Sequence, residues 1–124
     1  ALAFLDVGPL SEGHTLVIPK QHYATLDQAP TETAAAIGAA LPALARAIME
    51  ATGSTDYNIL QNNGAPAGQD VFHVHFHLIP RKPGTVRKDA TPGHGLPARP
   101  WPAQEVDHEK AAALAGSISA AISQ

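Results

Sequence analysis

Three histidines alternate with apolar residues near the middle of the chain, in the run from His73 to His77 that reads HVHFH. Successive side chains of a β-strand point to opposite faces of the sheet. The run therefore predicts three imidazoles on one face, with Val74, Phe76 and Leu78 on the other. The apolar face can pack against a core, which leaves the histidines facing a cleft or solvent. Three of the seven histidines lie in this pentapeptide, so we expect the functional site there.

The size and composition of the chain limit what it can be. Its 124 residues suit a single domain that spans residues 1–124 and is large enough to bury a core. The formal net charge of -3 provides no general basic surface for duplex nucleic acid or an anionic membrane. The lack of cysteine excludes disulfides and thiolate zinc sites. No apolar run approaches the roughly 20 residues of a membrane span, and no signal peptide is visible, so we expect a cytoplasmic protein.

Short apolar segments and two helical patterns predict an α+β fold with a mainly antiparallel sheet. We expect four strands, which cover residues 2–7, 14–18, 56–61 and 71–79. Residues 80–103 are rich in proline, glycine and basic side chains, which predicts an irregular loop or flap. A C-terminal helix is expected over residues 104–124. A sheet of this size has exposed edges, so we expect the chain to form a homodimer.

A long central helix is expected between Pro30, at its first turn, and Gly53, which can cap its C-terminus. Its apolar positions recur every four or three residues and predict one buried stripe of Ile37, Leu41, Leu44 and Ile48. Pro42 lies inside this pattern, removes one helical hydrogen bond and crowds the carbonyl of Gly38. We therefore expect a kink or a break at that point.

The row of histidines is compatible with two kinds of chemistry, of which metal binding is the first. Neutral imidazole is the commonest metal ligand in proteins. A zinc or iron site, however, usually gathers ligands from several elements and often includes a carboxylate. Asp70 is the nearest carboxylate in the sequence, and a regular strand would place it on the opposite face from His73. A metal site stays open as the less favoured alternative.

Nucleophilic attack on phosphorus is the second kind of chemistry. An imidazole nitrogen can attack a phosphoryl group when an acceptor holds the other nitrogen as N–H. Neighbouring imidazoles can then donate to the phosphoryl oxygens and protonate the leaving group. The loop before the histidines contains Gly64 and Gly68, which permit close backbone approach to anionic oxygens. This combination favours phosphoryl chemistry.

The pattern resembles the His-φ-His-φ-His-φ-φ signature of the histidine-triad (HIT) proteins, where φ is an apolar residue. The resemblance covers roughly residues 2–81, because three upstream segments follow the family's order and approximate spacing: AFLDV at 3–7, GHTLVIPK at 13–20, and NNG at 62–64 with GQ at 68–69. It is closest to the Hint-like and general bacterial-type branch. The galactose-1-phosphate uridylyltransferase branch differs in carrying His-Pro-His.

The resemblance implies a HIT-like fold and a hydrolase or transferase that cleaves a nucleoside monophosphate, AMP by expectation, from its leaving group. His75 would be the nucleophile and form a nucleotidyl-histidine intermediate. His73 and His77 would flank it, one contacting the phosphate and the other supporting the hydrogen-bond network, and His14 would join them from another strand. The implied nucleotide-binding residues are Phe4, Leu5 and Ile18 around the base, Asp6 at the ribose, and Asn62, Gly68 and Gln69 around the phosphate and leaving group.

Several of these residues also have ordinary structural explanations. Phe4 and Ile18 fit a hydrophobic core equally well, and Asp6 could simply shape a turn. We interpret His22 as structural. Asp70 stands where relatives often carry a serine or threonine, and a carboxylate cannot donate a hydrogen bond to phosphate.

The preferred substrate class is an adenosine phosphoramidate or an AMP-lysine adduct, cleaved by a purine nucleoside phosphoramidase. A dinucleoside polyphosphate hydrolase is the first alternative. A nucleotide-binding regulatory protein with incidental turnover and a histidine-based metal protein are the others. The nucleophile requires no cofactor or metal, although Mg²⁺ could accompany a polyphosphate substrate.

Overall fold

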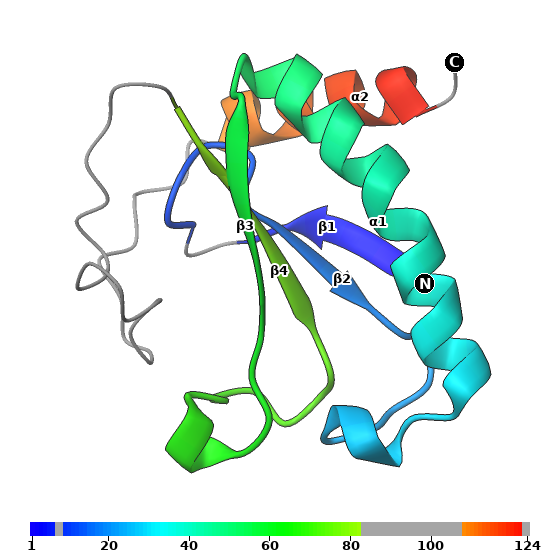
Figure 1. Cartoon of the computed structure of the whole chain (residues 1–124). Helices are drawn as coiled ribbons and strands as arrows, with labels where there is room; N and C mark the ends of the chain where they lie inside the picture. Colours follow the sequence, from blue (N-terminus) through cyan, green and yellow to red (C-terminus); the bar gives the residue numbers. More distant parts are fainter. Residues whose placement is uncertain (7–8, 83–107, 123–124) are drawn as a thin grey trace.

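The computed structural model describes residues 1–6, 9–82 and 108–122 of the chain (Figure 1). Of residues 117–122 only the helical backbone is described. The elements in chain order are β1 (Leu2–Leu5), β2 (Thr15–Ile18), η1 (Leu26–Gln28), α1 (Thr31–Thr52), β3 (Asp56–Gln61), η2 (Ala65–Ala67), β4 (Phe76–Arg81) and α2 (His108–Ile122). The predicted α+β class is confirmed.

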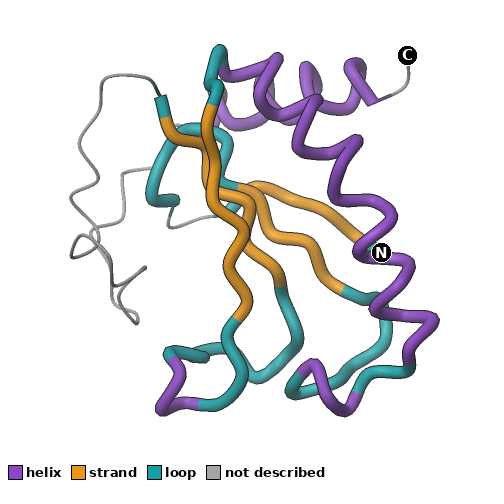
Figure 2. Tube along the Cα trace, viewed as in Figure 1, coloured by secondary structure: helices purple, strands orange, loops and turns teal. Residues whose placement is uncertain are grey.

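The four strands form one antiparallel sheet with the order β1-β2-β4-β3. Both helices lie on the same side of this sheet and contact one another (Figure 2). Opposed residues of antiparallel strands share a face. One face, here the helix face, carries Val17 and Leu78, which pack in the core under α1. The opposite face, here the histidine face, carries His77.

The stripe predicted for α1 forms the core of the protein. Ile37, Leu44 and Ile48 are buried in one cluster with residues of the sheet, and Leu41 packs against it. Gly53 caps the helix in the left-handed conformation, as expected. By length and hydropathy α1 could also cross a membrane, which the sequence pattern did not suggest. Ile37, Leu44 and Ile48 of this helix are, however, buried in the core cluster with residues of the sheet.

α1 continues through Pro42 without a break, so of the kink or break expected from the sequence the break is wrong and the kink stays a prediction. A proline inside a helix costs about 3 kcal/mol. Burial of a large aliphatic side chain contributes about 1.5–3 kcal/mol. Because Ile37 lies before Pro42 and Ile48 lies after it, packing on both sides holds the helix together. Pro42 itself is exposed, so water can satisfy the carbonyl that loses its partner.

The predicted strand over residues 71–79 is the main error in the predicted fold. β4 begins at Phe76, so His77 alone of the three histidines lies on a strand. The physical reason is a lack of paired strand, because the pairing of β4 with β2 ends at Val17–Phe76 and its pairing with β3 ends at Gln61–Phe76. His73 and His75 therefore precede the sheet rather than form part of it.

The other boundaries agree with the sequence or fall outside the described residues. β3 has the predicted limits, whereas β1 and the start of β2 are shorter than expected. Of the predicted flap, residues 83–103 lie outside the described part of the chain. Residues 104–107 of the predicted C-terminal helix also lie outside it, and α2 is described from His108 onward.

Candidate active site

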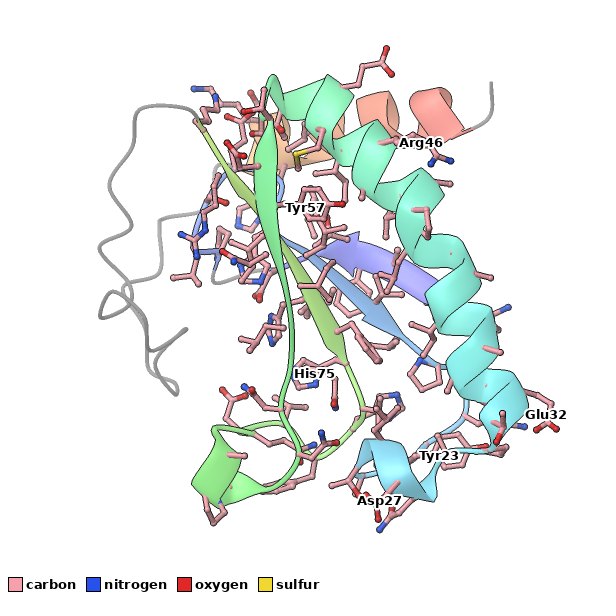
Figure 3. All side chains as sticks on the ribbon, in the orientation of Figure 1. Tyr23, Asp27, Glu32, Arg46, Tyr57 and His75 are labelled. Atoms are coloured by element: carbon pink, nitrogen blue, oxygen red, sulfur yellow. The ribbon has the colours of Figure 1, made fainter. Side chains whose placement is uncertain are left out.

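His75 is held in the tautomer that a nucleophile needs. Its Nδ1 lies 2.7 Å from the main-chain oxygen of His73. A carbonyl oxygen can only accept, so Nδ1 carries the hydrogen and Nε2 of the neutral ring keeps its lone pair. His75 is buried and lies just before β4, at the end of the sheet where the η2 loop is found (Figure 3). The acceptor expected from the sequence is thus a backbone group.

His14 and His77 form a second, fully buried unit behind the nucleophile. The amide of Leu10 donates to Nδ1 of His14 at 3.0 Å. An amide nitrogen cannot accept, so His14 is neutral with its hydrogen on Nε2. That Nε2–H lies 2.9 Å from Nδ1 of His77 and donates to it. His77 therefore carries its own hydrogen on Nε2.

The two units meet at the rings of His75 and His77. The ring centroids lie 4.9 Å apart and the rings meet edge to face at 71°. An imidazole with an Nε2 lone pair thus lies beside an imidazole with an Nε2–H. This arrangement can attack a phosphorus atom and donate to one of its oxygens at the same time.

A buried carboxylate adds negative charge to the histidine pair. Oδ2 of Asp6 lies 3.5 Å from Nε2 of His14 and 4.0 Å from Nδ1 of His77. The three ligand-type atoms lie within 4.8 Å of one another, as in a site for a metal ion. The sequence pointed to Asp70 as the carboxylate of a metal site, and to Asp6 only at the ribose. The β1–β2 hairpin brings Asp6 to the histidines, where its amide donates to the His14 carbonyl.

The hydrogen bonds of His14 oppose metal binding at this cluster. A metal on Nε2 requires a neutral His14 with the hydrogen on Nδ1. That hydrogen would displace the Leu10 amide and leave it unpaired beside a buried ring, at a cost of about 1–3 kcal/mol. The residues around His14 therefore fit a hydrogen-bonded pair better than a metal centre.

An apolar row extends from the histidines across the sheet. His77 opposes Leu16, and Leu16 opposes Phe4, so all three side chains lie on the histidine face. Phe4 is two strand spacings from His77, or about 10 Å, which matches the reach from a phosphate to its nucleobase. Phe4 is 48% exposed, as expected of a side chain that can cover a flat ring.

The row agrees with only part of the predicted base pocket. Ile18 is on the histidine face, opposite Leu2. Leu5 lies on the helix face and packs against the core, so the structure does not bring it together with Phe4 and Ile18. Leu2 and Leu16, which were not expected from the sequence, share the two-residue period of Phe4 and Ile18 and lie on the histidine face.

The loop before the histidines is fastened by the side chain of Gln69. Its Oε1 accepts from the Gly64 amide at 2.7 Å, and its Nε2 donates to the carbonyls of Ala24 and Val71 at 2.6 and 3.1 Å. Both amide hydrogens are used, so the structure places Gln69 as a clamp within the loop rather than as a free phosphate donor. Asn62 donates to the Gly68 carbonyl at 3.3 Å. Gly64 and Gly68 have the positive φ values that favour glycine.

A family model described as HIT domain matches residues 1–84. The chain belongs to the HIT family. Adenylylsulfatase HINT3 of Arabidopsis thaliana is 53% identical over 81 residues, which cover 65% of this chain and 41% of that protein. Adenosine 5'-monophosphoramidase hnt1 of Schizosaccharomyces pombe is 43% identical over 122 residues, which cover 98% of this chain and 82% of that protein. The crystal structure of a hypothetical histidine triad nucleotide-binding protein from Sulfolobus tokodaii matches with a TM-score of 0.79 and 31% identity, over 98% of this chain and 76% of that one.

The HIT assignment confirms the resemblance seen in the sequence, and the structural match confirms the fold. The structure brings His14, His75 and His77 together with Asp6, while the ring of His73 turns elsewhere. Nδ1 of His73 lies 2.9 Å from Nδ1 of His22, a residue interpreted as merely structural. No signal in the sequence identifies this partner, because 51 residues separate the two histidines.

Proposed function

We propose that this HIT protein hydrolyses adenosine 5'-phosphoramidates and related AMP adducts through an intermediate on His75. The observation that carries the proposal is the hydrogen bond from Nδ1 of His75 to the His73 carbonyl, with His77 alongside. The nearly full-length match to a relative named adenosine 5'-monophosphoramidase supports the substrate class.

The reaction has two steps, and His75 returns to its starting form. In the first step the Nε2 lone pair attacks the α-phosphorus, and the bond to the leaving group breaks as that group departs with the electron pair and takes up a proton from solvent. In the second step water attacks the phosphorus and loses a proton to solvent, the P–N bond breaks, and AMP and neutral His75 result. The Nε2–H of His77 donates to a phosphoryl oxygen in both steps, and loss of such a donor typically costs about 10²–10³ in rate.

The nucleotide would lie along the row on the histidine face, with its phosphate at His77 and its base over Phe4. Leu16 lies between these residues and would support the sugar. Phe4 and Ile18 would give the base an apolar surface without a charged group, which suits stacking. Dinucleoside polyphosphates, with Mg²⁺ on the bridging phosphates, form the second substrate class.

Hydrolysis of adenosine 5'-phosphoramidate tests the proposal directly. Wild type should release AMP, and His75→Ala should be inactive. His108→Ala, which removes an exposed histidine of α2, should keep wild-type turnover and serves as the matched control. Quenching in an alkaline denaturant, in which a P–N bond survives, should trap AMP on the wild-type protein alone. Full turnover by His75→Ala, or an inert wild type with both substrate classes, would refute the proposal.

We also propose that the chain forms a homodimer through β3, which is an edge of the sheet. Tyr57 and Ile59 lie on the helix side of this edge strand and are 46% and 43% exposed. Tyr57 is labelled in Figure 3. A second copy can pair with the same edge around a two-fold axis and cover both side chains. Ile59→Lys should give a monomer in light scattering, whereas Leu2→Lys, at the opposite edge, should not. A monomeric wild type would exclude this dimer.

A further inference from the structure

The position of the nucleophile depends on contacts from outside the sheet. His75 precedes β4, and the pairings of β4 with β2 and with β3 both stop at Phe76. A main chain without ladder partners needs other hydrogen bonds to hold one conformation. The first part of the connection between β2 and α1, residues 19–26, supplies them and is called the bracing segment below.

The bracing segment contacts both the histidines and the loop before them. The Val74 amide donates to the Tyr23 carbonyl at 2.7 Å. Nε2 of His73 lies 3.1 Å from the Pro19 carbonyl. The Ala24 carbonyl accepts from Gln69 at 2.6 Å, and the Leu26 amide donates to Oδ1 of Asn63 at 2.8 Å. Figure 3 shows Tyr23 of this segment at the same end of the sheet as His75.

The tautomers of His22 and His73 follow from these contacts. The Pro19 carbonyl can only accept, so Nε2 of His73 carries the hydrogen and its Nδ1 has a lone pair. Nδ1 of His22, 2.9 Å away, must therefore donate to it. The His73 ring is thus held at both nitrogens by the bracing segment. The main-chain oxygen of the same residue accepts from His75.

We infer that His22 is a positioning residue for the nucleophile. It holds the His73 ring in one tautomer and orientation, and so fixes the His73 carbonyl that sets the lone pair of His75. The inference rests on the proposed function for its kinetic consequence, but the tautomer of His73 does not depend on any substrate. His22 is exposed and outside the core, so its loss should change the site without unfolding the protein.

The kinetic test compares His22→Ala, His22→Asn and a neighbouring control. Loss of one neutral hydrogen bond should lower kcat about five- to tenfold in His22→Ala, with KM nearly unchanged. His22→Asn should restore most of the loss, because its side-chain amide can donate from a position close to that of Nδ1. Gln21→Ala removes an exposed side chain of the bracing segment that bonds to the Tyr23 hydroxyl, and should behave as wild type.

The spectroscopic test measures the imidazole ¹⁵N shifts of His73 without substrate. Wild type should show the Nε2–H tautomer, and His22→Ala should show a mixture of tautomers. The inference is overturned by an Nδ1–H tautomer in wild type, by wild-type kcat in His22→Ala, or by a change in KM alone. Equal losses of kcat in His22→Ala and His22→Asn would also overturn the inference, because a hydrogen-bond donor in place of Nδ1 would then not restore the function of His22. An inert wild type would refute the proposed function, while the ¹⁵N shifts would still decide the role of His22.

Discussion

Asp6→Asn separates two roles that a buried carboxylate can have in this site. The resemblance to HIT proteins predicts that Asp6 accepts hydrogen bonds from the ribose. The structure instead places its Oδ2 beside Nε2 of His14 and Nδ1 of His77. We expect the carboxylate to act mainly through this histidine pair, by stabilising the positive charge that develops on His75 as its lone pair bonds to phosphorus. The asparagine keeps the shape of the side chain and removes its charge.

The distance in the structure sets the size of the effect. Oδ2 of Asp6 lies 4.0 Å from Nδ1 of His77, and the ring centroids of His77 and His75 lie 4.9 Å apart, so the carboxylate lies within about 10 Å of the His75 ring. Two unit charges about 10 Å apart interact by about 1.7 kcal/mol at an effective dielectric constant of 20. If about half a charge develops on the His75 ring, the loss is about 0.8 kcal/mol, or about fourfold in kcat. KM should change by less than about twofold, because the interaction strengthens in the transition state.

The assay measures kcat and KM with adenosine 5'-phosphoramidate and with its 2',3'-dideoxy analogue, for wild type and Asp6→Asn. If Asp6 acts on the histidines, loss of the ribose hydroxyls costs both proteins the same factor. If it binds the ribose, that cost disappears in Asp6→Asn, and the electrostatic reasoning is refuted. Asp56→Asn, which changes an exposed carboxylate of β3, is the control. Circular dichroism should show that both variants are folded.

Two further predictions concern the scaffold of the site. Gly13→Ala should lower the free energy of unfolding by about 2–5 kcal/mol in urea titrations. Gly13 has φ +87°, and a Cβ there would lie 2.6 Å from Cγ2 of Thr52. An unchanged urea midpoint would contradict this prediction. Gln69→Ala should raise KM and increase the backbone hydrogen exchange of residues 62–70, because three hydrogen bonds of the loop are lost. If kcat alone falls and exchange is unchanged, Gln69 contacts the reacting phosphate instead.

The sequence predicted elements better than it predicted the site. Periodicity identified the core stripe of α1 and the limits of β3, because packing on one face leaves a direct pattern in the chain. The resemblance grouped Leu5 with Phe4 around the base, whereas the two-residue period puts their side chains on opposite faces of the sheet. Periodicity extended the last strand back to residue 71, because the HVHFH pattern cannot show that pairing with the neighbouring strands has already ended. Contacts such as His22 with His73 join distant residues and leave no local signal.

The histidines of this site are alike in sequence and differ through the backbone groups that they meet. The Leu10 amide donates to Nδ1 of His14 and so leaves the hydrogen of His14 on Nε2. That Nε2–H donates to Nδ1 of His77, so His77 also carries its hydrogen on Nε2. The His73 carbonyl imposes the opposite tautomer on His75. An amide can only donate and a carbonyl can only accept. The conformation of the main chain therefore determines that His77 is the hydrogen-bond donor and His75 the nucleophile. A variant that moves the turn at Leu10 should therefore impair the donor role of His77 with every catalytic side chain still present.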